Sequence, residues 1–285
     1  MPVQNLPGLV LDRAHPLARG LVGWWPMNEG GGIRINDLVN GNYGTFGTGI
    51  VPSATAGWAG GALGRSVGTD ASDDIIAVPH SPALALTGDM TISVWLYTRN
   101  AAGATYQAFS SKGVVGIGYA SPWIAMIWTD ATIIISYGNG VGAANTWSTG
   151  TVPSNQWFNL VITRKGSAIT FYKNGAQLGT AGDIGAQAVT DAGTAYLIGG
   201  RTPGTLYGMN GWQCHHRLYS RAIGVSEIAQ LYADPLAGAL APARASRLIV
   251  PVVISPPAAI AAPPTADRLW NRGYVGRIFR RGEKG

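Results

Sequence analysis

Short segments rich in β-branched and aromatic residues recur along the chain, and Gly, Asn and Pro separate them. This pattern is typical of β-strands joined by turns. The clearest strands are expected at residues 90–97, 123–128, 132–137, 157–164, 168–173, 195–198 and 212–219. Because no helical repeat of apolar positions lies between these strands, we expect an antiparallel sandwich rather than a parallel sheet with crossover helices.

The dipeptide Asn-Gly occurs at 40–41, 139–140, 174–175 and 210–211. A type I′ hairpin turn needs a positive φ at both central residues, and Asn followed by Gly adopts that geometry readily. We therefore expect the chain to turn at these four places.

One helix is expected, at residues 226–233. Ile228, Leu231 and Tyr232 recur at helical spacing and share one face. Ser226 can cap the first turn, and Pro235 ends the segment. A helix this short closes a sandwich rather than forming its core.

Composition narrows the class of protein. The 285 residues are 46% hydrophobic and only 12% charged, about half the usual charged share. Ten Trp and eleven Tyr supply a core, which excludes a disordered chain. No apolar run approaches the ~20 residues of a transmembrane helix, so we expect no membrane span. A single cysteine, Cys214, excludes an internal disulfide.

The charge of the chain is confined to one end. Residues 1–243 contain twelve Lys/Arg and twelve Asp/Glu, whereas the last 42 residues contain eight and two, which is the whole net charge of +6. A neutral body with a basic tail suggests attachment to an acidic surface, a nucleic acid or a partner protein. The alternative is a tail that only keeps the protein soluble.

Residues 236–267 are mostly Ala, Pro, Ile, Val and Leu, with two Pro-Pro pairs, which favours a semi-rigid spacer. Beyond the spacer, bulky apolar residues alternate with arginines. A tail that only kept the protein soluble would not need these apolar residues. We therefore expect residues 268–285 to dock on a partner protein rather than on a specific nucleic-acid sequence. The expected anchors are Arg268, Trp270, Arg272, Tyr274, Arg277, Ile278, Phe279, Arg280 and Arg281.

Seven segments add a further pattern when they are taken in order. They are GLVGWWPMNEG at 20–30, DLVNGNYGT at 37–45, GTDASDDIIAVP at 68–79, TISVW at 91–95, QWFNLVITR at 156–164 with ITFYKNG at 169–175, LIGG at 197–200 with RLYSRAI at 217–223, and EIAQLY at 227–232. In this order they resemble the laminin-G-like (concanavalin A-like) jelly-roll domains. The resemblance implies an all-β fold, a two-sheet antiparallel jelly-roll sandwich closed by one short C-terminal helix and followed by an extended basic tail.

With this resemblance, the chain divides into four expected parts. They are an N-terminal extension (1–19), the jelly roll (20–235), the spacer (236–267) and the docking arm (268–285). The N-terminus has no basic, apolar signal segment, so no secretion signal is expected.

The resemblance also implies a class of function. Members of the family mostly bind glycans or proteins, and many are virion or cell-surface components without catalytic activity. A jelly roll with a docking tail and no secretion signal is similar to bacteriophage structural proteins. We therefore expect a non-catalytic virion protein, present in many copies or as a homo-oligomer, that decorates a capsid or belongs to a tail or fibre. Its arm would bind capsid or tail proteins while the sandwich faces outward.

Two other functions stay open. One is a free lectin that binds cell-surface glycans, with calcium as its ion. The other is a glycosidase-like enzyme, whose relatives use two carboxylates on one strand. This chain has only Glu29, Glu227 and Glu283, none of them paired within a confident strand, and Gln213 to His216 stand where many relatives have acidic residues. We therefore expect no catalytic residue.

A glycan would need exposed aromatic rings, because the C–H face of a sugar packs on a ring while its hydroxyls bond to nearby polar groups. The candidates in turn-like surroundings are Tyr43, Trp58, Tyr106, Trp123, Trp147 and Tyr207.

Asp70, Asp73 and Asp74 form the best cluster for a hard cation, since calcium takes several carboxylate oxygens at close spacing. Asn28, Glu29 and Asp37 would complete such a site. The alternative is an Asx-type turn. Apart from Ca²⁺ we expect no cofactor. Cys214, His215 and His216 are adjacent on a strand and point apart, so they do not suit one metal ion.

Overall fold

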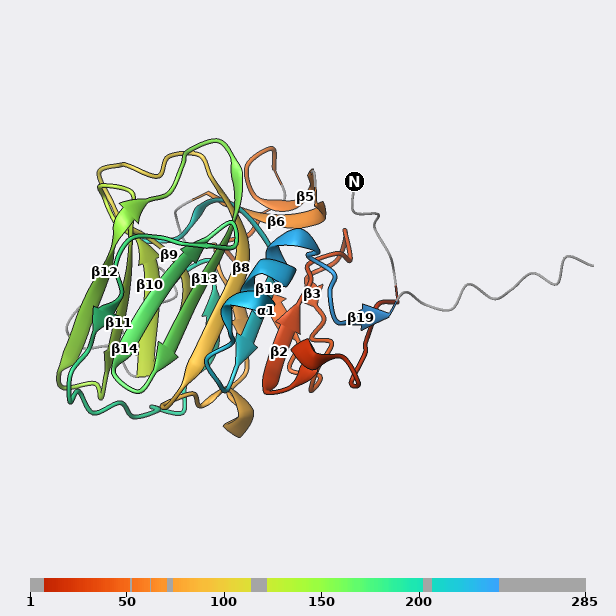
Figure 1. Cartoon of the computed structure of the whole chain (residues 1–285). Helices are drawn as coiled ribbons and strands as arrows, with labels where there is room; N and C mark the ends of the chain where they lie inside the picture. Colours follow the sequence, from red (N-terminus) through yellow and green to blue (C-terminus); the bar gives the residue numbers. More distant parts are fainter. Residues whose placement is uncertain are drawn as a thin grey trace, which may run out of the picture. The chain divides into compact units, whose positions relative to one another are not determined.

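The structure, a computed structural model, describes residues 8–51, 53–61, 63–70, 74–113, 122–201 and 207–240. Within these ranges the strands form two large antiparallel sheets and one two-stranded ribbon (Figure 1). The all-β antiparallel sandwich expected from the strand pattern is confirmed.

One sheet has eight strands in the spatial order β12-β11-β10-β9-β17-β7-β4-β3. In chain order these are β3 (Arg34–Ile35), β4 (Gly44–Phe46), β7 (Ile76–Val78), β9 (Gln107–Gly113), β10 (Pro122–Ile127), β11 (Thr132–Gly138), β12 (Ala143–Thr151) and β17 (Tyr196–Ile198).

The other sheet has nine strands in the order β15-β14-β13-β8-β18-β6-β5, with β16 beside β14 and β2 beside β18. These are β2 (Leu21–Trp25), β5 (Gly57–Gly61), β6 (Gly64–Asp70), β8 (Met90–Thr98), β13 (Trp157–Lys165), β14 (Ala168–Lys173), β15 (Ala176–Gln177), β16 (Gly182–Asp183) and β18 (Asn210–Tyr219). Two 3₁₀ turns, η1 (Pro16–Ala18) and η2 (Pro82–Leu84), lie outside the sheets.

The main core lies between the two sheets. In β10, Trp123, Ala125 and Ile127 belong to this core, while Ile124 and Met126 belong to a separate apolar cluster. Because successive side chains of a strand point to opposite faces, the second cluster lies on the face of the eight-stranded sheet that points away from the core. We call this the outer face.

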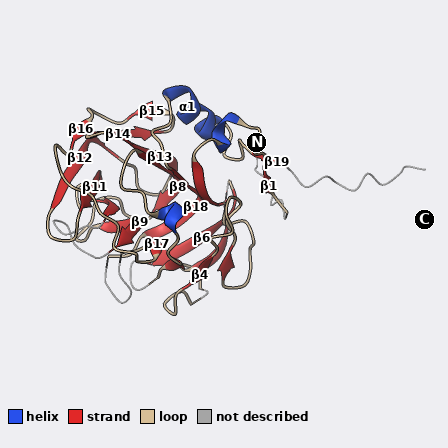
Figure 2. Ribbon diagram, turned by 90° about the horizontal axis from the view of Figure 1, so that it is seen from below, coloured by secondary structure: helices blue, strands red, loops and turns tan. Residues whose placement is uncertain are grey.

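The helix α1 (Val225–Ala233) covers the other side of the sandwich. Figure 2 shows it on the side of the nine-stranded sheet that faces away from the eight-stranded sheet. Ile228 and Leu231 are buried there with Val161 of β13, as their spacing predicted. Tyr232, the third residue of the predicted face, is 41% exposed and stacks on Trp95 of β8 at 5.8 Å.

The start of α1 differs from the prediction. The N-cap is Gly224 rather than Ser226, and its N–H donates to Glu227 Oε2 at 2.9 Å. The Glu227 carboxylate also accepts two hydrogen bonds from Arg221. Sequence preference favours Ser as the cap, but here the side chain of Glu227 satisfies the first turn in its place.

The Asn-Gly turns have mixed outcomes. The prediction is confirmed at 174–175, where φ values of 52° and 80° form the tight β14–β15 turn, and 139–140 joins β11 to β12. The pair at 40–41 lies in the β3–β4 connection. The prediction is wrong at 210–211, which lies inside β18. There Gly211 is needed for another reason, because a Cβ would collide with the Tyr97 carbonyl oxygen of β8.

A short ribbon joins two distant parts of the sequence. β1 (Val10–Leu11), in the expected extension, pairs with β19 (Ala239–Leu240), in the expected spacer. The compact unit containing the sandwich runs from Met1 to Ala243. The docking arm, residues 268–285, lies outside the described residues. No helix in the described ranges has the length and hydropathy needed to cross a bilayer.

Candidate functional site

Three aromatic side chains from different connections form a parallel stack. Tyr106 precedes β9, Trp128 follows β10, and Tyr207 precedes β18. The Tyr106 ring lies 5.1 Å from Trp128 at an interplanar angle of 5°, and 4.3 Å from Tyr207 at 10°. All three side chains are half-buried, and Tyr106 and Trp128 pack against the apolar cluster of the outer face. We call these three residues the aromatic stack.

Strand register places the stack. Gln107 pairs with Ile127 between β9 and β10, so the residues that flank this pair, Tyr106 and Trp128, become neighbours. The N–H of Ala108 donates to the carbonyl of Tyr207 at 2.9 Å, which brings in the third ring. Two predicted glycan residues, Tyr106 and Tyr207, are thus brought together across about one hundred positions of sequence.

Polar groups gather at one end of the stack. The Arg201 guanidinium lies over the Tyr207 ring at 4.1 Å and over the Tyr106 ring at 5.5 Å. The Tyr106 hydroxyl is hydrogen-bonded with Tyr207 and Arg201. Burial, followed by the Tyr207 hydrogen bond, raises the pKa of Tyr106, while the charge of Arg201 opposes the shift. The Tyr106 hydroxyl therefore stays protonated at neutral pH and can donate.

A row of residues crosses the outer face beside the stack. Trp147 of β12 pairs with Ile134 of β11, and Met126 of β10 lies in the next strand of the same cluster. Trp147, a predicted glycan residue, is 42% exposed. One row away, Ser136 Oγ and Asn145 Oδ1 are buried and have no hydrogen-bond partner among the described residues. Met126, Ile134 and Ser136 are buried, so the parts of this face that a ligand can reach are the open ring of Trp147 and the half-buried aromatic stack.

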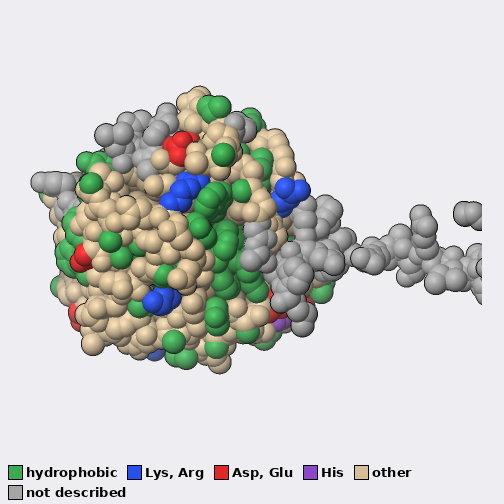
Figure 3. Space-filling view, turned by 90° about the horizontal axis from the view of Figure 1, so that it is seen from above, with side chains coloured by type: hydrophobic (Ala, Val, Ile, Leu, Met, Phe, Trp, Pro, Cys, Tyr) green, Lys and Arg blue, Asp and Glu red, His purple; other side chains and the backbone are tan. Residues whose placement is uncertain are grey.

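A second group of rings lies on the nine-stranded sheet. Tyr97 of β8 pairs with Trp157 of β13 and with Trp212 of β18, with ring centroids 5.8 and 5.0 Å apart and edge to face. Arg99 lies over Trp212 at 4.0 Å, but its guanidinium already donates to the carbonyls of Thr69 and Thr55. Figure 3 looks from the side on which β5 and β6 lie and shows a stripe of hydrophobic side chains with Lys or Arg beside it.

The remaining predicted glycan residues lie elsewhere. Trp123 is a core residue, 1% exposed, and its ring packs 5.6 Å from Tyr196, so the prediction of a surface role is wrong for this residue. Trp58 is half-buried against Phe46 at 5.5 Å. Tyr43 is 43% exposed under the guanidinium of Arg34 at 4.0 Å. It lines a pocket of about 190 Å³ with His80.

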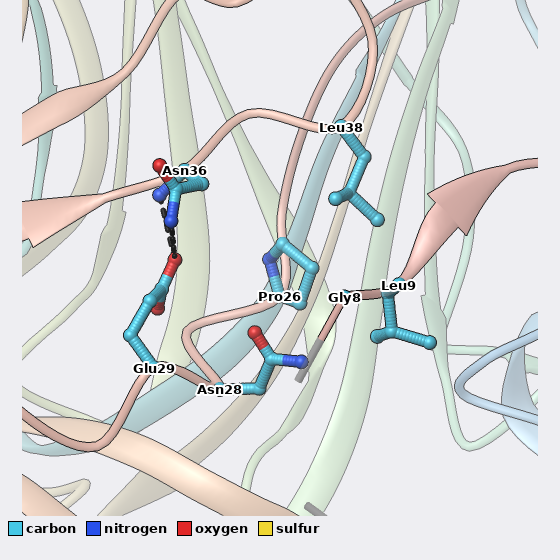
Figure 4. Close-up of a pocket in the computed structure, with 7 residues that line it drawn as sticks. All are labelled: Gly8, Leu9, Pro26, Asn28, Glu29, Asn36 and Leu38. Atoms are coloured by element: carbon cyan, nitrogen blue, oxygen red, sulfur yellow. Dashed lines mark hydrogen bonds between the residues drawn. The ribbon is translucent and has the colours of Figure 1, made fainter. Parts of the chain in front are cut away.

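A pocket of about 320 Å³ lies after β2 (Figure 4). Its lining residues are Gly8, Leu9, Pro26, Asn28, Glu29, Asn36 and Leu38. Glu29 Oε1 accepts from the Asn36 backbone N–H at 2.7 Å and from the Asn36 side-chain amide at 3.0 Å. Glu29 supplies the one carboxylate in this lining.

Asp37, expected to complete a cation site with Glu29, has another role. Its two oxygens accept backbone N–H groups from four residues, namely Trp24, Val39, Asn40 and Asn42. Both carboxylate oxygens of Asp37 are thus engaged by backbone N–H groups, and Asp37 stabilises the turn between β3 and β4. It is not one of the residues that line the pocket.

The aspartate cluster is described only in part. Asp74 is buried, and its Oδ2 accepts the backbone N–H of Asp70 at 2.8 Å, whereas Asp73 lies outside the described residues. Over the ranges that are described, no three His, Cys, Asp or Glu side chains group as metal ligands. The calcium site of Asp70, Asp73 and Asp74 therefore stays a prediction.

The Cys-His-His segment lies at a β-bulge in β18. The pairing with β8 shifts between Cys214 and Arg217, and His215 has a positive φ of 49°. His216 bonds to the hydroxyl groups of Tyr196 and Ser110 in the interior. Burial lowers the pKa of both histidines to about 3, with the charge of Arg217 adding to the shift at His215. Both imidazoles are neutral core groups.

Comparison with known proteins agrees with this architecture. A laminin G family model described as the concanavalin A-like lectin/glucanases superfamily matches residues 70–229, more than half of the chain. Among curated proteins, no sequence matches the chain.

Solved structures with a similar fold include the binding domain of Paraclostridial Mosquitocidal Protein 1 (16% identity, TM-score 0.58, 75% of this chain and 52% of that one). A second is the ligand-binding domain of botulinum neurotoxin serotype D in complex with N-acetylneuraminic acid (13%, 0.55, 75% and 50%). The chain thus spans about half the length of these two.

A third is domain 4 of AbnA, a GH43 extracellular arabinanase from Geobacillus stearothermophilus, in complex with arabinotriose (17%, 0.56, 74% and 98%). Identities this low show the fold alone. Toxin binding domains and a domain that holds an oligosaccharide share it with this chain.

Proposed function

The chain belongs to the concanavalin A-like lectin/glucanases superfamily, and on this premise we propose that it is a non-catalytic glycan-binding protein whose ligand lies on the outer face, between Trp147 and the aromatic stack. The observation that carries the proposal is the stack itself, in which two tyrosine hydroxyls and a guanidinium meet beside flat rings. Sugar binding needs this combination of an apolar ring surface and a few converging polar groups.

The dimensions favour an oligosaccharide over a single sugar. Trp147 lies two strands across from Met126, and Trp128 is two residues beyond Met126, so the two tryptophans are about 12 Å apart. Trp147 offers an open ring, and the stack offers donors at the other end. A chain of at least two sugar units would touch both.

Other aromatic residues suit a ligand less well. The donors of Arg99 beside Trp212 are committed to backbone carbonyls, and the Trp58 indole N–H donates to the Gly32 carbonyl at 2.7 Å. A group already bonded within the protein gains nothing from a sugar hydroxyl.

The absence of catalysis is part of the proposal. Hydrolysis of a glycosidic bond uses two carboxylates that face each other across the bond. Glu227 is held by Arg221 at the start of α1, and Glu29 is the one acid among the lining residues of its pocket. In the part of the chain that the structure describes, neither of these glutamates belongs to a group of acidic side chains.

Binding tests the ligand surface directly. Glycan-array screening of the full chain, followed by calorimetric titration with the best oligosaccharide, should show binding that Trp147→Ala and Tyr207→Ala each weaken about tenfold or more, because each removes a ring contact. Tyr43→Ala, an exposed tyrosine outside the site, is the matched control and should bind like the wild type. Equal losses in all three variants, or none in the first two, would contradict the site.

We further propose that the protein works on a virion, in many copies, with its basic arm bound to capsid or tail proteins. The support is the separation of charge in the sequence, a neutral body of 243 residues and a tail that carries the whole +6. A display protein of this kind would present its glycan surface to the outside while the tail held it in place.

A further inference from the structure

Among the described residues no acid or backbone carbonyl is bonded to Arg201, in contrast to the stacked arginines Arg99, Arg217 and Arg221. Arg99 donates to carbonyls, Arg217 donates to the Pro235 and Ala237 carbonyls, and Arg221 pairs with Glu227. Arg201 takes part in none of the ion pairs among described residues, and its Nε is buried with no hydrogen-bond partner.

The surroundings fix this charge in place. The guanidinium carbon lies 4.1 Å from the Tyr207 ring centroid and 5.5 Å from that of Tyr106, so the charge is held beside both rings. The Tyr106 hydroxyl interacts with both Tyr207 and the Arg201 guanidinium. No carboxylate is among the groups that shift the pKa of Tyr106. A partly buried positive charge is thus held beside the two tyrosines, and none of the ion pairs within the described residues compensates it.

Such a group of donors matches one kind of ligand. A carboxylate has only acceptors, and a guanidinium can give it two parallel hydrogen bonds that are charge-assisted and therefore stronger than neutral ones. A neutral sugar hydroxyl would use one donor and leave the charge uncompensated. The arrangement therefore discriminates by charge as well as by shape.

We propose that Arg201, with the hydroxyls of Tyr106 and Tyr207, recognises the carboxylate of an acidic sugar, so that the ligand of this surface is a uronic-acid-type or other carboxylated glycan. The inference rests on the proposed function, because the carboxylated sugar would be one unit of the oligosaccharide on the outer face. The rings hold the sugar, and Arg201 selects its acidic group.

The test compares ligands that differ only in charge. Oligogalacturonides and their methyl esters have the same backbone, and esterification removes the negative charge. Calorimetric titration of the full chain should show the free acid binding about tenfold tighter than the ester, with a difference that shrinks as salt is added. Arg201→Gln should lower affinity for the acid about tenfold and leave the ester unchanged.

Two controls separate charge recognition from damage to the fold. Arg34→Gln changes an arginine that also stacks on a tyrosine, Tyr43, outside the site, and it should bind both ligands like the wild type. Arg201→Lys keeps the charge but not the flat fork, and it should bind the acid between the wild type and Arg201→Gln. Circular dichroism should show all three variants folded.

The outcomes are distinct. If acid and ester bind equally, or if Arg201→Gln weakens both alike, recognition of the carboxylate is overturned while glycan binding stands. If neutral oligosaccharides bind to the Trp147 surface and no acidic ligand does, the inference again fails alone. If no glycan of either kind binds, the proposed function and the inference fall together.

Discussion

Two adjacent histidines of β18 connect single residues to the acid stability of the whole protein. Both are buried, and burial lowers their pKa from an ordinary 6.5 to about 3. Between about pH 6.5 and pH 3, the unfolded chain therefore binds protons at these positions that the folded chain does not. The free energy of unfolding therefore decreases as the pH falls through this window, by up to about 1.4 kcal/mol per pH unit for each imidazole.

His216→Gln tests this linkage. Glutamine does not titrate and can still bond to the hydroxyls of Tyr196 and Ser110. Urea unfolding between about pH 6 and pH 4 should show the variant losing stability less steeply than the wild type, by about 1.4 kcal/mol per pH unit. Parallel curves for the two proteins over that range would mean that His216 is protonated in the folded state.

At the scale of the element, β18 depends on a glycine. A Cβ at Gly211 would collide with the Tyr97 carbonyl oxygen, which belongs to the adjacent β8 backbone and cannot turn away. Gly211→Ala should therefore lower the free energy of unfolding by about 3 kcal/mol in urea denaturation. Gly60→Ala, in β5, is the control, because no atom lies within 4 Å of its added Cβ. Similar stability of both variants would show that β8 and β18 can separate at this point.

Strands were predictable where their side chains face the core. β8, β13 and β14 follow the expected segments within about one residue, because buried apolar positions in them repeat clearly. The edge strand β12 escaped prediction, since Ala, Asn, Thr, Ser and Gly around Trp147 have no such pattern. The helix α1 was predicted, but its first turn is capped by the Glu227 side chain rather than by the residue that local preference favours.

The candidate site was predictable only as separate residues. Tyr106 and Tyr207 could be named because aromatic residues in turns are conspicuous, but their contact depends on pairing between distant segments. Trp128 looked like the last residue of a strand, and Arg201 had no motif to mark it. Trp123 was misassigned because a tryptophan at a strand end reads the same in sequence whether it points inward or outward.

At the scale of the whole molecule, body and tail have separate tasks in the proposed function. The compact unit ends at Ala243, and the excess of positive charge begins with Arg244. A chain without residues 244–285 should keep the melting temperature and the oligosaccharide affinity of the full chain, because the compact unit that contains the sandwich ends at Ala243. It should fail to join virions in a complementation assay that counts copies per particle. Normal incorporation of the shortened chain would remove the arm from the proposal.

The ribbon of β1 and β19 decides how the body would respond to a pull. Val10 and Leu240 are paired neighbours, so tension between the flanking segments would first unzip two residue pairs. The next interaction to resist the pull is made by Arg217. Its guanidinium is buried over Trp24 at 3.8 Å and donates a hydrogen bond to the Pro235 carbonyl at 2.7 Å, a few residues before β19. Under mechanical load the β1–β19 ribbon and then the Arg217–Pro235 hydrogen bond would break first. The outer face would keep its structure until both had broken.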